Sequence, residues 1–416
     1  MTKHYTKKQI GSIAGAVMLM MGYGIINAGV SYFVAPVTED LAFQRSSFTL
    51  YYTIMNVVAT AVMPFAGRIV KRYEPRRILA VGLAGGLGCI AAFSLASQLW
   101  HFYILGAMVG LFKDSCTLLM VGVVMNRTFG RKSGTPIGIA MSGSGLCGIL
   151  LGLVMPAILE RYGWRCGYLF QAAAWAVIFG AAILLLRDPE PEEEDAVQMS
   201  GDYTTRDVTL KEAKHSVWLY LMMLALIMMS APGNFLLHMP SYYVEQGLSA
   251  KIAGKIISFY SFGIMLFKIV EGHLFDKIGD VKTTVLTMGV FAIGLWVSLS
   301  TVPLALYIGA VLLSFGMAAL TVLPPLLTRN VFGQREYASI YGLISMTFAM
   351  ANAVGAPMWG LIHDASGSYQ WGVRYIPWMI LLGMSTMALI LRNKDRLFHQ
   401  AEQDLKSEKP ARRKRV

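Results

Sequence analysis

Residues 272–279 read GHLFDKIG, and this short polar stretch between two long apolar ones decides the fold. An earlier stretch of the same character, residues 67–77, reads GRIVKRYEPRR. Gly272 follows Gly67 by 205 positions (272 minus 67). Both stretches therefore mark the same point in two copies of one unit, if other landmarks repeat at the same offset.

Two further pairs of landmarks do repeat at nearly that offset. Residues 126–132 read NRTFGRK and residues 329–335 read RNVFGQR, with their phenylalanines 203 positions apart (332 minus 129). Trp164 and Trp371 are 207 positions apart (371 minus 164). Self-similarity at one offset indicates a duplication.

Around these landmarks the apolar residues fall in blocks of the length that spans a bilayer, about 20 residues. The chain is 55% hydrophobic and only 14% charged. Backbone groups in lipid must be satisfied within their own segment, so the blocks predict helices. The twelve predicted spans are 10–34, 46–66, 78–98, 101–127, 135–157, 167–187, 216–240, 251–272, 283–300, 304–328, 338–362 and 373–392.

These spans predict an all-α membrane protein with two pseudo-symmetric six-helix bundles, at 1–187 and 216–392. Residues 188–215 are polar and acidic and contain no apolar block, which indicates a solvated linker between the bundles. Residues 393–416 form a basic tail.

Basic residues gather in alternate loops, which predicts that both termini and the linker are cytoplasmic. The net charge of +12 arises mostly from this asymmetry. Anionic lipid headgroups explain the basic tail better than nucleic acid does, so we expect membrane lipids as partners and no nucleic acid. The first apolar block is long enough to span by itself, which argues against a cleavable signal peptide. We expect a multi-pass protein of a prokaryotic plasma membrane.

Signatures of enzymes and of metal sites are missing from the sequence. There is no phosphate loop, no zinc-binding HExxH pair and no nucleophile elbow. The four cysteines, Cys89, Cys116, Cys147 and Cys166, are too far apart to indicate a disulfide framework or a metal site. We therefore expect no enzymatic activity, no cofactor and no metal, and any energy for transport to come from gradients.

The stretch 272–279 resembles the cytoplasmic-loop motif of the major facilitator superfamily, and the resemblance covers essentially the whole chain. The segments 35–41 (APVTEDL), 45–50 (RSSFTL) and 143–148 (GSGLCG) resemble the oxalate/formate antiporter and monocarboxylate transporter branch. The resemblance implies two halves that alternate access to a substrate site between them, near the midplane.

The loop motif differs between its two copies. Its residues are Gly67, Arg68 and Arg72 in the first copy and Gly272, Asp276, Lys277 and Gly279 in the second. In the first copy, Lys71 stands where the superfamily usually has Asp, and Glu74 stands where it has Gly. The usual charge relay is therefore absent from the first copy or is carried by Glu74.

Ionisable side chains at membrane depth are costly and indicate function by default. Lys113 and Asp114 lie near the middle of the fourth span, about 100° apart around the helix. Asp114 is a candidate for proton coupling, and Lys113 for attracting an anion or for holding Asp114 ionised. The alternative is that each residue pairs structurally with a neighbouring helix.

Lys268 precedes Asp276 by eight residues, roughly 12 Å along a helix. In the oxalate/formate branch, a basic residue at this spacing binds the substrate carboxylate, so the resemblance implies that role for Lys268. Lysine offers a point charge where the branch usually has the fork of arginine. The alternatives are snorkelling to the cytoplasmic interface or a pair with Glu271 at i+3.

The eleventh span has no cation. The dicarboxylate-handling member of the branch has a second lysine there, and Phe348 takes that position in the segment 345–352 (SMTFAMAN). A single cation in the second half fits a substrate with one carboxylate better than a substrate with two. Phe348 would pack on an apolar substrate body.

Uncharged polar residues within the spans are weaker candidates, because such residues more often form hydrogen bonds between helices. Those that could line a substrate site are Asn27, Asn56, Asn234, Tyr260 and Asn352. His238 lies toward the outer end of the seventh span and could couple to protons, although an interfacial histidine is the alternative.

The resulting hypothesis is a monomeric secondary transporter of a small organic anion, most simply a monocarboxylate, coupled to protons or to a counter-anion. The first alternative is a proton-driven exporter of larger amphipathic compounds, such as drugs, bile acids or steroid conjugates. The second is a transport-derived sensor, which the short linker and tail disfavour.

Overall fold

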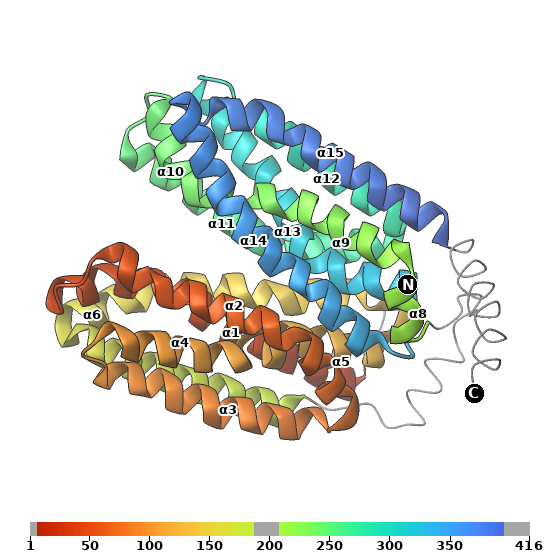
Figure 1. Cartoon of the computed structure of the whole chain (residues 1–416), viewed down its shortest axis with the longest axis horizontal. Helices are drawn as coiled ribbons and strands as arrows, with labels where there is room; N and C mark the ends of the chain where they lie inside the picture. The colour runs from red at the N-terminus through yellow and green to blue at the C-terminus, as the bar shows by residue number, and fades with distance from the viewer. Residues whose placement is uncertain (1–5, 187–207, 395–416) are drawn as a thin grey trace, which may run out of the picture. The chain divides into compact units, whose positions relative to one another are not determined.

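The structure is a computed structural model that describes residues 6–186 and 208–394. These residues form helices and connecting turns and contain no strand, as the sequence predicts (Figure 1). The acidic part of the predicted linker and nearly all of the predicted basic tail lie outside the described residues.

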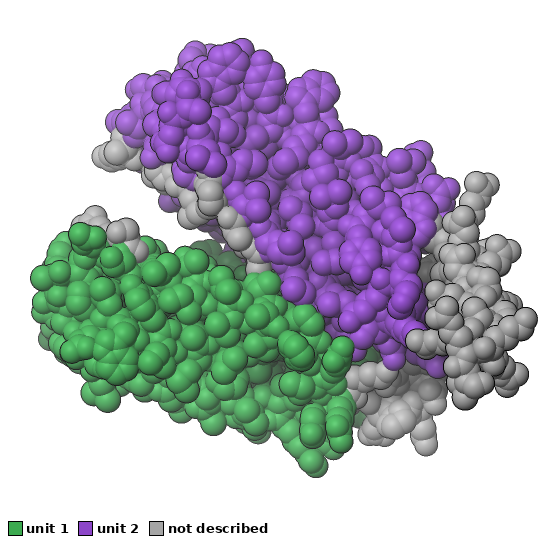
Figure 2. All heavy atoms as spheres, viewed as in Figure 1, with its two compact units in different colours: residues 1–201, 268–276 green, residues 202–267, 277–416 purple. Residues whose placement is uncertain are grey.

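The chain divides into two compact units, coloured separately in Figure 2. The first unit comprises residues 1–201 and 268–276, and the second comprises residues 202–267 and 277–416. One helix contributes to both, because its residues 268–276 pack with the first unit. The pseudo-symmetric halves predicted from the repeat remain a prediction.

The first unit is built from long helices joined by short turns. They are α1 (Lys7–Asp40), α2 (Arg45–Arg72), α3 (Pro75–Ala92), η1 (Phe93–Leu95), α4 (Leu99–Asp114), η2 (Ser115–Leu119), α5 (Met120–Phe129), η3 (Gly130–Lys132) and α6 (Gly134–Leu185).

The second unit is also built from helices joined by short turns. Its helices are α8 (Leu210–His215), α9 (Val217–Ser230), η4 (Ala231–Asn234), α10 (Phe235–Glu245), most of α11 (Ala250–Ile278), α12 (Asp280–Val297), α13 (Pro303–Phe332), α14 (Tyr337–Ser366) and α15 (Gln370–Arg392).

Ten helical stretches of the described residues are long and apolar enough to cross a membrane. One of them, α6, covers both the fifth and the sixth predicted spans in 52 residues. The chain bends within it at Gly163, whose φ of +76° is accessible to glycine without steric cost. The predicted eleventh span coincides with α14. Each of the other predicted spans also lies mainly on helix.

Two local features differ from the predicted spans. The seventh span is interrupted by the 3₁₀ turn η4, where Pro232 lacks a backbone donor and Gly233 weakens the helix. The end of the predicted linker forms the short helix α8, because Thr209 and Glu212 make a reciprocal capping box at its start.

Aromatic side chains form the core of the first unit. Phe93 stacks on Phe102 and on Tyr168, with ring centroids 5.7 and 5.1 Å apart, and Phe33 stacks on Tyr168 at 3.8 Å. Offset stacking adds about 0.5–1.5 kcal/mol per pair beyond the buried area. This packing joins α1, η1, α4 and α6 into a frame that holds the polar residues described next.

Candidate functional site

Lys113 lies at the centre of a polar cluster inside the first unit. Only 2% of its side chain is exposed. Its ammonium group donates to Asn56 Oδ1 at 2.6 Å and to Asn27 Oδ1 at 3.2 Å. Three of the residues that the sequence predicted separately, on α1, α2 and α4, therefore meet at one point.

Two tyrosines that the sequence analysis missed complete the cluster. The Lys113 ammonium lies 5.6 Å from the ring centroid of Tyr23 and 5.8 Å from that of Tyr52, within cation–π range. The Tyr52 hydroxyl also donates to Asn27 Oδ1 at 2.9 Å. Each tyrosine precedes its asparagine by four residues, so a Tyr-x-x-x-Asn pattern shared by both spans was the available signal.

Asp114 provides the nearest opposite charge to Lys113. Its Oδ1 lies 3.6 Å from the ammonium, and 17% of its side chain is exposed. The next five residues, Ser115–Leu119, form a π-helical turn. Such turns are rare and often occur at functional sites. The turn changes the direction of side chains directly after the charged pair.

Lys268 is buried in the first unit, where it contacts α6. Its side chain is 6% exposed and donates to Ser144 Oγ at 2.9 Å and to the Met141 carbonyl at 3.3 Å. Both partners are neutral. Neither carboxylate oxygen of Glu271 has a hydrogen-bond partner in the described part of the chain, so the predicted alternative of a pair with Glu271 is not formed here.

Glycines allow the stretch of α11 around Lys268 to approach α6 closely. A Cβ atom on Gly272 would collide with the backbone carbonyl of Gly134, and one on Gly138 would collide with the Lys268 carbonyl. Just beyond, Asp276 accepts hydrogen bonds from the backbone N–H groups of Gly134 (3.0 Å) and Thr135 (2.8 Å). The Asp276 carboxylate thus caps the N-terminus of α6, where the helix dipole favours a negative charge.

Gly272→Ala is expected to destabilise the protein, because the added methyl meets backbone and not a flexible side chain. Overpacking of this kind costs about 1–3 kcal/mol. Thermal unfolding in detergent should show a lower midpoint for Gly272→Ala. Gly88→Ala is the matched control, since a methyl group at Gly88 would meet open space. Equal midpoints for the two variants would contradict the close packing.

The first copy of the loop motif is arranged differently. Gly67 is buried, while Arg68 and Arg72 are exposed. Glu74 forms an exposed ion pair with Arg77 at 3.4 Å. Exposed pairs of this type contribute little to stability. In the second copy, Lys277 and Gly279 are exposed, and Gly279 has a φ of +84° at the turn between α11 and α12.

The predicted candidates of the second unit do not gather into one hydrogen-bonded cluster among the described residues. Asn234 donates to the carbonyls of Ala231 (3.2 Å) and Ala351 (3.4 Å), which joins η4 to α14. Tyr260 is buried on α11, and Phe348 is half-buried on α14. The side chain of Asn352 lies outside the described part of the chain.

His238 belongs to a separate group of polar residues. Its Nδ1 lies 3.0 Å from the Tyr369 hydroxyl, and the His363 ring packs on Tyr369 at 4.5 Å. His363 Nε2 lies 3.0 Å from Glu245 Oε1. Partial burial, and then the nearby Glu245 and Asp364 carboxylates, raise the pKa of Tyr369, so this tyrosine stays neutral and bonds to His238.

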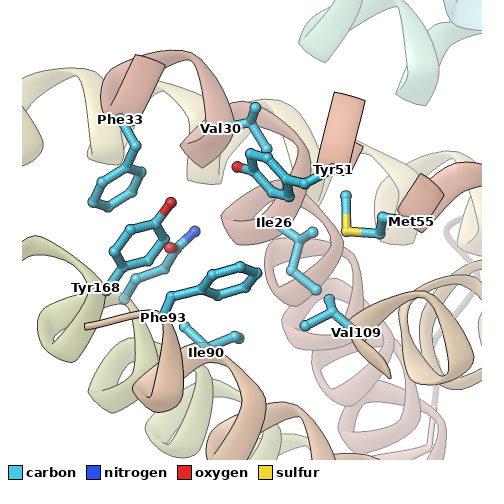
Figure 3. A pocket seen from close by; sticks show the side chains of 10 residues that line it. Ile26, Val30, Phe33, Tyr51, Met55, Ile90, Phe93, Val109 and Tyr168 are labelled. Carbon is cyan, nitrogen blue, oxygen red and sulfur yellow. The ribbon is translucent and has the colours of Figure 1, made fainter. Parts of the chain in front are cut away.

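A pocket inside the first unit lies among the aromatic residues of the core (Figure 3). Its lining residues are Ile26, Val30, Phe33, Tyr51, Met55, Ile90, Phe93, Val109, Tyr168 and Gln171. None of them is charged. Ile26 and Met55 line the pocket while the next residues, Asn27 and Asn56, bond to Lys113, so the pocket and the cluster occupy different faces of α1 and α2.

Long apolar helices that bury ionisable residues in their interior are typical of membrane proteins with a functional site within the bilayer. The sequence model of the Major Facilitator Superfamily matches residues 12–279 and 245–414. The chain belongs to the major facilitator superfamily, as its loop motif indicated. It is therefore a multi-pass membrane transporter and not an enzyme.

Individual relatives are distant. An "MFS-type transporter" of Gibberella moniliformis is 24% identical over 376 residues, which cover 87% of this chain and 85% of the relative. "Monocarboxylate transporter 13" of Bos taurus is 25% identical over 323 residues, 74% and 71% of the two chains. "Multidrug resistance protein MdtG" of Escherichia coli is 24% identical over 331 residues, 77% and 78% of the two chains.

Solved structures support the fold. The proton:xylose symporter XylE, solved with 6-bromo-6-deoxy-D-glucose, superposes with a TM-score of 0.71 at 13% identity, over 92% of this chain and 95% of that chain. At this identity the likeness concerns the fold alone.

The relatives correct the expected localisation. The prediction of a prokaryotic plasma membrane is wrong, because relatives that match most of the chain are fungal and mammalian proteins. Hydropathy and loop charges carry no information about the kingdom of origin. A membrane protein with several spans is what the comparisons support.

Proposed function

We propose that this transporter moves a small organic anion, a monocarboxylate, by secondary active transport with alternating access. The observation that carries the proposal is the Lys268 ammonium group, which is buried and has only neutral hydrogen-bond partners among the described residues. A buried charge is costly without a counter-ion. A substrate carboxylate would supply that counter-ion.

A single carboxylate suits the distribution of charge better than two. Lys113 already has Asp114 at 3.6 Å and the oxygens of two asparagines, so its charge is largely balanced within the protein. Lys268 is left as the anion-binding cation. The similarity to a monocarboxylate transporter agrees with this choice.

Lys113 has a supporting role in this proposal. Its bonds hold α1, α2 and α4 together and keep Asp114 beside a cation. The predicted roles of Asp114 and His238 in proton coupling, and of Asn27, Asn56, Asn234, Tyr260, Phe348 and Asn352 in lining the substrate site, stay proposals.

The function is tested by a ligand screen followed by uptake. Purified protein is first heated with acetate, lactate, pyruvate and benzoate, with oxalate and malonate, and with amphipathic compounds such as deoxycholate and ethidium. A ligand at 100 times its Kd stabilises the folded state by about 2.7 kcal/mol. Compounds of the class that the protein binds should therefore raise its unfolding temperature. We expect monocarboxylates to stabilise the protein and to enter proteoliposomes. Stabilisation by dicarboxylates alone would contradict the single-carboxylate proposal.

The second candidate function is export of larger amphipathic compounds. The observation in its favour is the similarity to a multidrug resistance protein, together with the 26 methionines that suit adaptable apolar packing. The same screen separates the two functions. Stabilisation and flux with deoxycholate or ethidium, without response to any small monocarboxylate, would favour the exporter.

A further inference from the structure

A second ionisable side chain is buried one helical turn from Lys268. Glu271 on α11 is completely buried. Neither of its carboxylate oxygens has a hydrogen-bond partner in the described part of the chain. The other unpartnered acid oxygen, Asp114 Oδ1, lies 3.6 Å from the Lys113 ammonium. Among the acidic residues that the structure describes, Glu271 is therefore the one that is fully buried and has no hydrogen-bonded cation.

The helix stretches that the structure shows packed around this part of α11 hold no cation directed at Glu271. The α6 stretch 134–144, which packs on this part of α11 through Gly134 and Gly138, contains no ionisable residue. On α11 itself, Lys268 is turned to Ser144 and Met141, and Asp276 is bonded to the start of α6. His273 is exposed.

An ionised carboxylate in such a place is far more costly than a carboxylic acid, because only the ion loses strong hydration without compensation. We propose that Glu271 is a proton-binding site of this transporter, occupied in the conformation seen here, and that its proton leaves the positive charge of Lys268 available to an anion. A hydronium ion from bulk water gives up its proton: one of its O–H bonds breaks, an O–H bond forms to one carboxylate oxygen, and water is released.

This inference rests on the proposed function, which makes Lys268 the anion site. Ionised Glu271, at i+3 from Lys268, would compete with the substrate for the ammonium group. Protonated Glu271 does not compete. Proton and anion therefore favour each other's binding, and the coupling is reciprocal by linkage. Proton and anion would then enter together as a neutral unit, which is proton–anion symport.

The inference also distinguishes two acids in their expected behaviour. Asp114 lies 3.6 Å from the Lys113 ammonium, so its carboxylate has a cation beside it. Neither oxygen of Glu271 has a hydrogen-bond partner among the described residues. Exchange of Glu271 for its amide should therefore remove a bound proton.

The decisive experiment needs no substrate. Infrared spectra of the purified full-length protein are recorded at pH 7 in a maltoside detergent, which has no ester carbonyl. We expect a carboxylic acid C=O stretching band in wild type that is lost in Glu271→Gln and kept in the matched variant Asp114→Asn. If Glu271→Gln does not fold, Glu271→Asp should shift the position of the band. A band unchanged by substitution of Glu271, or lost in Asp114→Asn, would overturn the proposal.

A transport measurement then connects the proton site to flux. Pyruvate uptake into proteoliposomes is compared with and without an acidic exterior. We expect the acidic exterior to accelerate uptake by wild type and by Glu160→Gln, which changes an exposed acid outside the site, and not by Glu271→Gln. Acceleration retained in Glu271→Gln would overturn the coupling role. Absence of carboxylate uptake by wild type would instead overturn the proposed function and leave the infrared result standing.

Discussion

Lys268→Ala is expected to lower monocarboxylate uptake by about 30- to 4,000-fold. The substitution removes the buried ammonium that the substrate carboxylate would pair with, and loss of one partner of such a pair costs about 2–5 kcal/mol. Each 1.4 kcal/mol corresponds to a factor of ten, which gives the stated range. The measurement is the initial rate of pyruvate or lactate uptake into proteoliposomes, at equal protein content.

Two variants make the result for Lys268 specific. Lys255→Ala removes an exposed lysine from the same helix and should leave uptake unchanged. Lys268→Arg keeps the charge and should retain part of the activity, although the fork of arginine fits Ser144 and Met141 differently. Uptake by Lys268→Ala equal to that of Lys255→Ala would exclude the carboxylate role.

Lys113→Met is expected to affect stability as well as transport. It removes the donor to Asn27 and Asn56 and leaves Asp114 without its cation. Breaking a buried pair on one side costs about 3–5 kcal/mol. The unfolding midpoint in detergent should therefore fall markedly, and uptake should fall with it.

The double variant Lys113→Met/Asp114→Asn separates the two effects of Lys113. It removes both charges at once, so no unpaired carboxylate remains, and part of the lost stability should return. Uptake should stay low if the lysine itself is needed. A double variant no more stable than Lys113→Met would show that the pair with Asp114 contributes little.

Much of the fold could be predicted from the sequence because a bilayer imposes the length and the apolar character of each span. The motif GHLFDKIG and its degenerate copy indicated the family. The break between the fifth and sixth spans was predicted as a loop, and the structure narrows it to a kink at Gly163, where the backbone leaves the helical conformation. The π-helical turn after Asp114 has no sequence signal that we recognise.

Individual residues of the Lys113 cluster were predicted, but the contacts between them were not. Lys113, Asn27 and Asn56 were each candidates, because polar residues at membrane depth are conspicuous. Their meeting depends on how α1, α2 and α4 rotate in the bundle, which spacing along the chain does not fix. Tyr23 and Tyr52 were missed because tyrosines are common here, with 19 in the chain.

For Glu271, the sequence suggested a contact that the structure does not form. The sequence suggested it as a partner of Lys268, because residues three apart on a helix are neighbours. The structure turns Lys268 toward α6, where Ser144 and the Met141 carbonyl accept its hydrogen bonds, and leaves the acid unpartnered among the described residues. Competition from a neighbouring helix cannot be seen in helical spacing alone.

The central claim is that a buried cation selects substrates by their negative charge. It is tested most directly by comparing uptake of radiolabelled pyruvate with that of pyruvamide, its neutral amide of nearly equal size, in the same proteoliposomes. The account predicts saturable uptake of the acid anion that depends on Lys268, and little uptake of the amide. Equal transport of both compounds, unchanged by Lys268→Ala, would contradict it.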